Sequence, residues 1–333
     1  VLAEISGEAA APYAAMLGPF LAAGAQALSA SQDVHRNKRW RYNWRFLLPL
    51  GLAMARHRSV QLLHFPPDYV LTRDQDYLSA HTTMRWAELL IVNGVPARDV
   101  PLYQNIIDIA PIAAPSDDGR NLDGVYTYYA EFVIALLKLW LPTPDGVTKP
   151  MVAFGSPVRG WLKSHYHAKL KVLSLETIAI TPELRVPTLA ANHPSFIYNA
   201  VDRLKDDPST PADERMPVLM RIMQEDLVAA NWQAAMGETP SANPQTTLDA
   251  CTKKWSSAVK QEQIQELVRS QVLGETPQQP AKLAPRFPVP PGAKLWLEHE
   301  PVRQRAIDEK VEALRQELGS LDGREPQDIV DVD

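Results

Sequence analysis

Residues 150–155 read PMVAFG, four apolar residues between a proline and a glycine. Short apolar runs bounded by Gly or Pro are typical of strands buried in a parallel sheet. Three further runs share the pattern: VQLLHF at 60–65, NIIDIA at 105–110 and PTLAAN at 187–192. A fifth strand is expected within KVLSLETIAI at 171–180. Periodicity alone leaves a buried helix open for any single run, but four runs in series favour a sheet.

Segments of helical character separate these runs, such as YYAEFVIALLKLW at 128–140. Strands that alternate with helices predict an α/β fold with a mostly parallel sheet. We therefore predict a three-layer α/β/α domain over residues 51–236, with a central sheet of four to five strands. A helical and basic segment at 1–50 precedes it. Residues 237–333 are expected to pack on this core as helices, a Pro-rich strap and an amphipathic helix.

The carboxyl-terminal part of the chain differs in character from the strand-rich part. Residues 216–236 place apolar side chains near one helix face, and Gly237 is expected to end that helix. Residues 261–273 repeat the pattern, and six prolines in 275–292 predict an extended strap. Residues 300–319 have apolar residues at helical spacing, which predicts an amphipathic helix that needs a partner surface in its own chain or another.

The composition is that of a soluble globular protein, with 333 residues of which 45% are hydrophobic and 22% charged. Cys251 is the only cysteine, so no intrachain disulfide is possible and a reducing, cytoplasmic compartment is expected. No run of eighteen apolar residues occurs, so no membrane span is expected. The Ala-rich beginning lacks a basic start and carries Pro12 and Pro19, which favours packing helices over a signal peptide.

Residues 35–46, HRNKRWRYNWRF, form the most basic stretch, although the net charge of −5 argues mildly against a non-specific nucleic-acid binder. Cations alternate with aromatic rings there, a combination suited to phosphate contact and base stacking. The alternative is an element that packs its rings on the core and leaves its cations in water. If the stretch binds DNA, Arg39 and Arg41 are the candidate contacts.

Several common catalytic motifs are absent from the sequence. No GxGxxG or GxxxxGK[ST] phosphate loop occurs. Ser156 is followed by a proline, which would spoil an oxyanion donor, so ester hydrolysis is not expected. His165 and His167 lie two residues apart without an acidic or Cys partner nearby, which favours a solvated loop over a metal site. We expect neither a metal nor another cofactor.

Polar residues follow the predicted strands at the points where they end. Ligands of open α/β sheets bind at the carboxyl ends of the strands. If the strands are neighbours, one pocket receives Asp68, Asp108 and His193, with Ser156 following the third strand. The alternative for His193 is a core histidine whose hydrogen bonds are satisfied within the fold.

These strand-end loops resemble the motifs of the uracil-DNA glycosylase superfamily, whose members are three-layer α/β/α domains. His193-Pro194-Ser195 matches the last motif of that superfamily residue for residue. MVAFGSPVRGWL at 151–162 resembles its strand–Gly element, and NIIDIAPI at 105–112 resembles its middle strand. The resemblance covers about residues 55–235.

The early motif of the superfamily is altered in this chain, which reads Pro66-Pro67-Asp68-Tyr69 and lacks the usual glycine. Asp74 and Asp76 are alternatives to Asp68. The resemblance implies that the protein flips a modified or deaminated base out of DNA and hydrolyses its N-glycosidic bond. His193 would then polarise the base carbonyl, and Asp68 would orient the attacking water.

The same resemblance implies roles for the other strand-end residues. Asp108, Tyr69 and Asn192 would bind the base, with Tyr77 or Trp86 as alternatives to Tyr69 for the aromatic platform. The DNA contacts would be Ser195, Ser156, Arg39 and Arg41. An ionised Asp108 only accepts hydrogen bonds, so it would oppose the O4 atom of uracil. The preferred base is therefore not plain uracil, unless Asp108 is protonated or directed elsewhere.

Two other functions remain open at the level of the sequence. One is a catalytically inactive protein of the same fold that binds DNA, or a protein partner through the helix at 300–319. The other is an unrelated α/β domain in which His193 is a structural residue.

Overall fold

The computed structural model describes residues 41–42, 57–64, 81–110, 112–113, 123–143, 146–206 and 212–274. Its centre is a five-stranded sheet in the order β3-β2-β5-β7-β6. The strands are β2 (Val60–Leu63), β3 (Ile106–Asp108), β5 (Met151–Phe154), β6 (Leu175–Ala179) and β7 (Arg185–Ala191). Four of them run parallel, and β6 pairs antiparallel with β7. The five predicted strands and the α/β fold class are confirmed.

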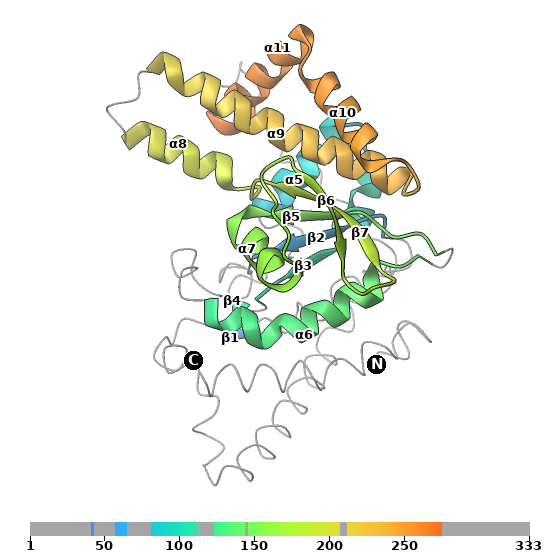
Figure 1. Ribbon diagram of the computed structural model, residues 1–333. Helices are drawn as coiled ribbons and strands as arrows, with labels where there is room; N and C mark the ends of the chain where they lie inside the picture. The colour runs from blue at the N-terminus through green and yellow to red at the C-terminus, as the bar shows by residue number, and fades with distance from the viewer. Residues whose placement is uncertain are drawn as a thin grey trace.

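Helices cover both faces of this sheet. They are α5 (His81–Val92), η5 (Ala97–Leu102, 3-10), α6 (Asp123–Trp140), α7 (Gly155–Tyr166), α8 (Phe196–Asp206), α9 (Ala212–Glu238), α10 (Pro244–Trp255), α11 (Ala258–Leu267) and the π-helical turn η7 (Val268–Val272). Figure 1 shows α5 and α9 on one side of the sheet and α6 on the other. Both α7 and α9 contact β5 and β7, and α6 contacts β3.

Alternation of side chains along the strands divides the core between the two faces. Val152 and Phe154 of β5 join the apolar cluster that includes α5 and α9, and the Phe154 ring meets Trp86 edge-on with centroids 4.6 Å apart. Met151 and Ala153 are fully buried but lie outside that cluster. Because successive side chains point to opposite faces, these two face the α6 and α7 side.

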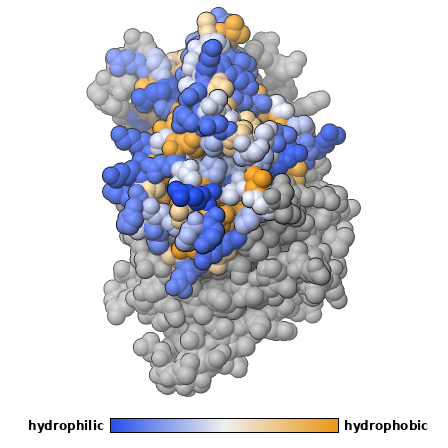
Figure 2. All heavy atoms as spheres, turned by 45° about the vertical axis from the view of Figure 1, so that its right-hand side comes forward, coloured by the Kyte–Doolittle hydropathy of each residue, from blue (hydrophilic) through white to orange (hydrophobic). Residues whose placement is uncertain are grey.

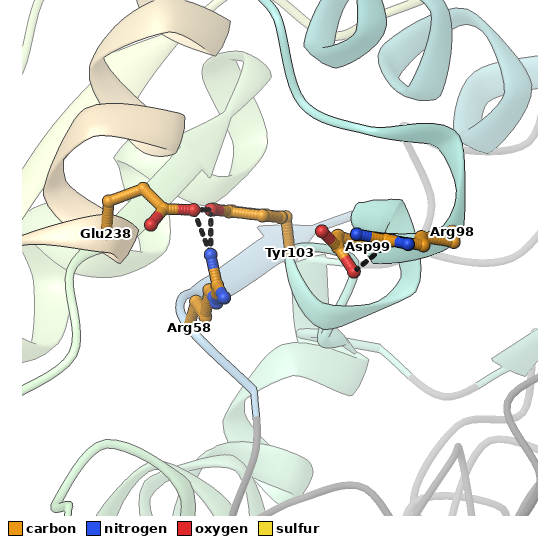
Figure 3. A network of polar contacts seen from close by, with 5 residues as sticks. All are labelled: Arg58, Arg98, Asp99, Tyr103 and Glu238. Atoms are coloured by element: carbon orange, nitrogen blue, oxygen red, sulfur yellow. Dashed lines mark hydrogen bonds and ion pairs between the residues drawn. The ribbon is translucent and has the colours of Figure 1, made fainter.

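The long helix α9 does not end before Gly237 as expected, but continues through it to Glu238. A Cβ atom on Gly237 would lie 2.7 Å from Cε1 of Tyr103, so the glycine allows a close approach rather than a helix stop. The Tyr103 hydroxyl donates to Glu238 at 2.6 Å and accepts from Arg58 at 2.8 Å (Figure 3). These contacts attach the end of α9 to the residues before β2.

The helices after α9 pack against it and share its core. The expected helix at 261–273 is present as α11 and η7, whereas α10 was not predicted. Its signal is present in the sequence, because Asn243 caps the helix by accepting from the Thr246 amide and Pro244 occupies the first turn. The helices expected within 1–50, the strap at 275–292 and the helix at 300–319 lie outside the described residues.

The surface of the described part is mainly polar. On the face shown in Figure 2, hydrophilic side chains cover most of the coloured area and apolar ones form small separate groups. Among the described residues, the exposed large hydrophobic side chains are Ile91, Phe196 and Val259. Phe196 directly follows the His193-Pro194-Ser195 motif, so its exposure bears on the site.

Candidate functional site

The carboxyl ends of β2, β3, β5 and β7 meet at one edge of the sheet, as the sequence predicted. His193 lies two residues beyond the end of β7, and its carbonyl accepts from the Phe196 amide at 2.7 Å as α8 begins. Its imidazole packs on Gly155, where β5 passes into α7. A Cβ atom on Gly155 would lie 3.4 Å from the His193 Cβ, and φ of Gly155 is 79°, so backbone conformation and packing both favour glycine there.

The hydrogen bonds of His193 favour one position for the ring proton. Nδ1 lies 2.7 Å from the Ser195 hydroxyl, a contact that either tautomer can make, and 3.4 Å from the Ser195 amide nitrogen. Because an amide N–H only donates, this second, long contact favours Nδ1 as the acceptor and the proton on Nε2. Burial lowers the pKa of His193 to about 4, so the ring is neutral at pH 7. A neutral imidazole with its proton on Nε2 suits donation to a carbonyl oxygen that gains negative charge.

A second histidine, His64, lies at the end of β2 on the same edge. Its Nε2 is hydrogen-bonded to the hydroxyl of Tyr126 on α6, and the ring centroids are 5.4 Å apart. Burial, together with the nearby His193, lowers the pKa of His64 to about 3. Sequence reasoning did not select His64, although a histidine directly after a buried parallel strand was a usable signal.

Asn192 is held by α9 rather than presented to the edge of the sheet. Its side-chain amide donates to Glu225 at 2.9 Å and to Asp226 at 3.3 Å, and the residue is 8% exposed. Burial raises the pKa of Asp226 to about 7, an effect that Arg85 and the hydrogen bond from Asn192 oppose. The amide donor proposed for the base is thus used within the fold, where it ties the His193 loop to α9.

Asp108 ends β3 and is buried, with 3% of its surface exposed. It pairs in register with Leu63, and both Leu63 and Ile106 belong to the apolar cluster on the α5 side. Alternation therefore places Asp108 toward α5, whereas His64 contacts α6 on the opposite side. The two strand-end side chains are consequently divided between the two faces of the sheet.

The remaining predicted site residues are only partly within the described ranges. Ser195 contacts His193, and Ser156 is exposed at the start of α7. Asp68, Tyr69 and Arg39 lie outside the described residues, as do Asp74 and Asp76, so their roles stay predictions. The backbone of Arg41 belongs to β1 (Arg41–Tyr42), which pairs antiparallel with β4 (Ile112–Ala113), a strand that begins four residues after the end of β3.

The histidine pair on α7 has a structural explanation. His165 Nδ1 bonds the Trp161 carbonyl at 2.9 Å and its ring packs on the Trp161 ring, with centroids 4.6 Å apart. His167 caps α7 in the left-handed conformation. Across the ranges the structure describes, no group of three or more His, Cys, Asp and Glu residues is placed to hold a metal ion.

Comparison of the sequence with models of known protein families and with curated proteins gives no match. None of the helices in the described ranges is long and apolar enough to cross a membrane.

Proposed function

We propose that this protein is a DNA glycosylase-like enzyme that takes a modified or deaminated base out of the DNA stack and hydrolyses its N-glycosidic bond. The observation that carries the proposal is the neutral His193, which lies at the edge where four parallel strands end and whose hydrogen bonds favour a proton on Nε2. The match of His193-Pro194-Ser195 to the last motif of the uracil-DNA glycosylase superfamily supports the same reading.

In the proposed reaction the bond between the sugar C1′ and the base nitrogen breaks, and its electron pair leaves with the base. His193 donates a hydrogen bond from Nε2 to the base carbonyl and stabilises the negative charge that develops there. A water oxygen then bonds to C1′, and the proton that this water loses neutralises the departed base. By the resemblance, Asp68 orients that water and stabilises the positive charge on the sugar.

Two observations favour a nucleic acid over a small nucleoside as the substrate. The pairing of β1 with β4 places the backbone of Arg41 and Tyr42, two residues of the basic stretch, beside the segment that follows β3. Phe196 has 36% of its surface exposed directly beyond Ser195, which offers an aromatic surface to an unstacked base. We expect Arg41 and Arg39 to extend the phosphate contacts along this side.

The position of Asp108 bears on the choice of base. It is directed toward the α5 face, so it does not have to oppose the O4 atom of uracil, and uracil returns as a candidate alongside hypoxanthine, xanthine and methylated bases. A cleavage assay on oligonucleotides that each carry one of these bases would identify the preferred substrate.

The test is abasic-site formation under single-turnover conditions by the wild type and H193A. We expect H193A to lower the rate by about 10² to 10³, the usual loss for a donor to a developing oxyanion. H165A is the matched control, because His165 lies on α7, where its imidazole is hydrogen-bonded to the Trp161 carbonyl and packs on the Trp161 ring. A wild type that is inactive on every base, or an H193A rate equal to that of the wild type, would contradict the proposal.

A second function is DNA binding without cleavage. It is favoured by Asn192, whose amide is committed to α9, and by Asp108, which is directed away from His64. In that case oligonucleotides bind the wild type and no abasic sites form. The D68A variant separates the two functions further. If the protein is an enzyme, D68A should reduce the rate of base cleavage; if it only binds DNA, D68A should leave its affinity for the oligonucleotide nearly unchanged.

A further inference from the structure

Arg159 lies on α7, one turn beyond Gly155, beside the candidate site. Its Nη1 donates to the Ala191 carbonyl at 3.3 Å, at the end of β7. Ala191 precedes His193 by two residues, and Gly155 packs on the His193 ring. The guanidinium is therefore held at the edge of the sheet where the strand ends converge.

No carboxylate in the described part of the chain pairs with Arg159. The ion pairs found there are Arg58–Glu238 and Arg98–Asp99. Arg159 is half-buried, and burial lowers its pKa, yet a guanidinium stays charged in proteins. A partly desolvated cation without a nearby negative charge is energetically unfavourable. In the described part of the chain, the guanidinium of Arg159 uses one of its five N–H donors, in the long hydrogen bond to the Ala191 carbonyl. An anionic ligand would offset this cost.

Ser156 provides a second group on the same side of α7. It precedes Arg159 by three residues, so the two side chains lie on neighbouring positions of the helix surface. Its side chain is exposed, and its hydroxyl makes no hydrogen bond to the described residues. A hydroxyl and a forked guanidinium are together suited to a phosphate group, which accepts several hydrogen bonds at once.

We propose that Arg159, together with Ser156, forms a phosphate-binding site beside His193 and holds a backbone phosphate of a single-stranded nucleic acid. The inference rests on the proposed function for the identity of the ligand, and it assigns to Arg159 the contact that positions the strand against His193. Arg159 is thus a binding residue of the same site rather than a participant in bond cleavage.

The test is equilibrium binding of a fluorescein-labelled single-stranded oligonucleotide to the full chain, followed by anisotropy at several salt concentrations. We expect R159Q to weaken binding about tenfold and to reduce the slope of log K against log salt by about 0.7, the loss of one phosphate contact. R159K is expected to lie in between, since lysine keeps the charge and loses the fork. K163Q, an exposed cation on the same helix, should change affinity less than about twofold.

Two further arms identify the source of the phosphate. An oligonucleotide with a neutral methylphosphonate backbone should bind the wild type more weakly than the ordinary strand does, and R159Q should weaken its binding no further. If R159Q abolishes binding of inorganic phosphate but leaves oligonucleotide affinity unchanged, the backbone assignment is overturned. Equal oligonucleotide affinity and salt slope for the wild type, R159Q and K163Q would overturn it as well.

If R159Q does not fold, chemical modification of arginine by phenylglyoxal can test the site in the wild-type protein. In the wild type the oligonucleotide should protect Arg159 from modification and leave the exposed Arg221 reactive, and absence of protection at Arg159 would contradict the site. The two proposals fail separately. A wild type that excises no base while R159Q loses affinity contradicts the glycosylase, whereas excision with unchanged R159Q affinity contradicts the phosphate site.

Discussion

Helix α9 carries two fully buried polar side chains about two turns apart, Asp226 and Gln233, and they differ in how completely they are hydrogen-bonded. Gln233 is satisfied: its amide donates to the Ser59 hydroxyl and the Tyr103 carbonyl, each at 2.7 Å. Its carbonyl oxygen accepts from Trp86 at 2.6 Å and from Gln61 at 3.3 Å. Asp226 accepts from Asn192 through one oxygen at 3.3 Å, and its other oxygen is buried with no hydrogen-bond partner.

The difference separates a part of the molecule that builds the fold from one that holds the candidate site. Gln233 joins α9 to β2 and α5, and a complete network of this kind stabilises one packing arrangement. Asp226 lies behind the loop of His193, and a buried carboxyl with a perturbed pKa is more frequent near functional sites than elsewhere. Asp226 therefore lowers stability on the side of α9 that faces the His193 loop.

Removal of Gln233 should have the largest effect on stability. Q233L leaves the indole N–H of Trp86 and the side-chain amide of Gln61 without their buried acceptor, whereas the Ser59 hydroxyl still donates to the Tyr103 carbonyl at 3.1 Å. At about 1 to 3 kcal/mol for each group left unpaired, we expect the free energy of unfolding to fall by about 4 to 5 kcal/mol. Urea denaturation measures this change. The control Q245L replaces an exposed glutamine of α10 and should stay within about 0.5 kcal/mol of the wild type.

A loss below about 1 kcal/mol in Q233L would show that the network relaxes around the substitution, and the contrast with Asp226 would then disappear.

The second effect is the pH dependence that Asp226 confers. Its pKa rises from 3.8 in the unfolded chain to about 7 in the fold, so the unfolded state loses its proton first as the pH increases. The stability that this carboxyl contributes in its neutral form is therefore fully present below pH 4 and is lost as the pH rises through 7. At about 1.4 kcal/mol for each pKa unit, this carboxyl lowers the free energy of unfolding by about 4 kcal/mol between pH 4 and pH 8.

D226N should remove that decline, because an amide does not titrate. The comparison is between the free energies of unfolding of the wild type and D226N across this pH range. D249N, which changes an exposed carboxyl of α10, should keep the slope of the wild type. Arg85, Glu225 and Asn192 are the other groups that face Asp226, and they are unchanged in both variants. Parallel curves for the wild type and D226N would refute a raised pKa.

The sequence was sufficient for the sheet because each strand has a local signal. MVAF is short, apolar and bounded by Pro150 and Gly155, and VQLL is short and apolar except for Gln61; burial on both faces leaves these strands without regular polar alternation. The position of His193 follows from the end of its strand. The pairing of β1 with β4 could not be foreseen, since it joins two short segments far apart in the chain.

The remaining parts of the site depend on packing that a sequence does not show. Asp226 and the exposed Asp249 are both acidic residues on helices, and only the tertiary contacts of α9 make one of them buried and hard to ionise. The same holds for Tyr126, which reaches His64 across the space between α6 and β2. Asn192 was assigned to a base because of its place in the motif, but the neighbouring helix takes up its amide.

The smallest effect concerns two glycines in helices. In α9, a Cβ at Gly237 would lie 2.7 Å from the Tyr103 ring and 3.1 Å from the Arg58 Cβ, so G237A must displace the residue whose carbonyl accepts from Gln233. We expect a loss of about 2 kcal/mol in the free energy of unfolding, within the range for overpacked positions. In α7, Gly160 has nothing within 4 Å of the added Cβ, so G160A should gain about 0.5 to 1 kcal/mol from helix propensity alone.

If urea denaturation gives a loss in the free energy of unfolding for G237A and a gain for G160A, the end of α9 that carries the fully hydrogen-bonded Gln233 is also tightly packed. A gain in G237A would mean that Tyr103 moves without cost, and the Gln233 network would then be less rigid than its hydrogen bonds indicate. The double variant G237A/Q233L sharpens the point. Because both changes act on Tyr103, their losses should add to less than the sum of the single losses.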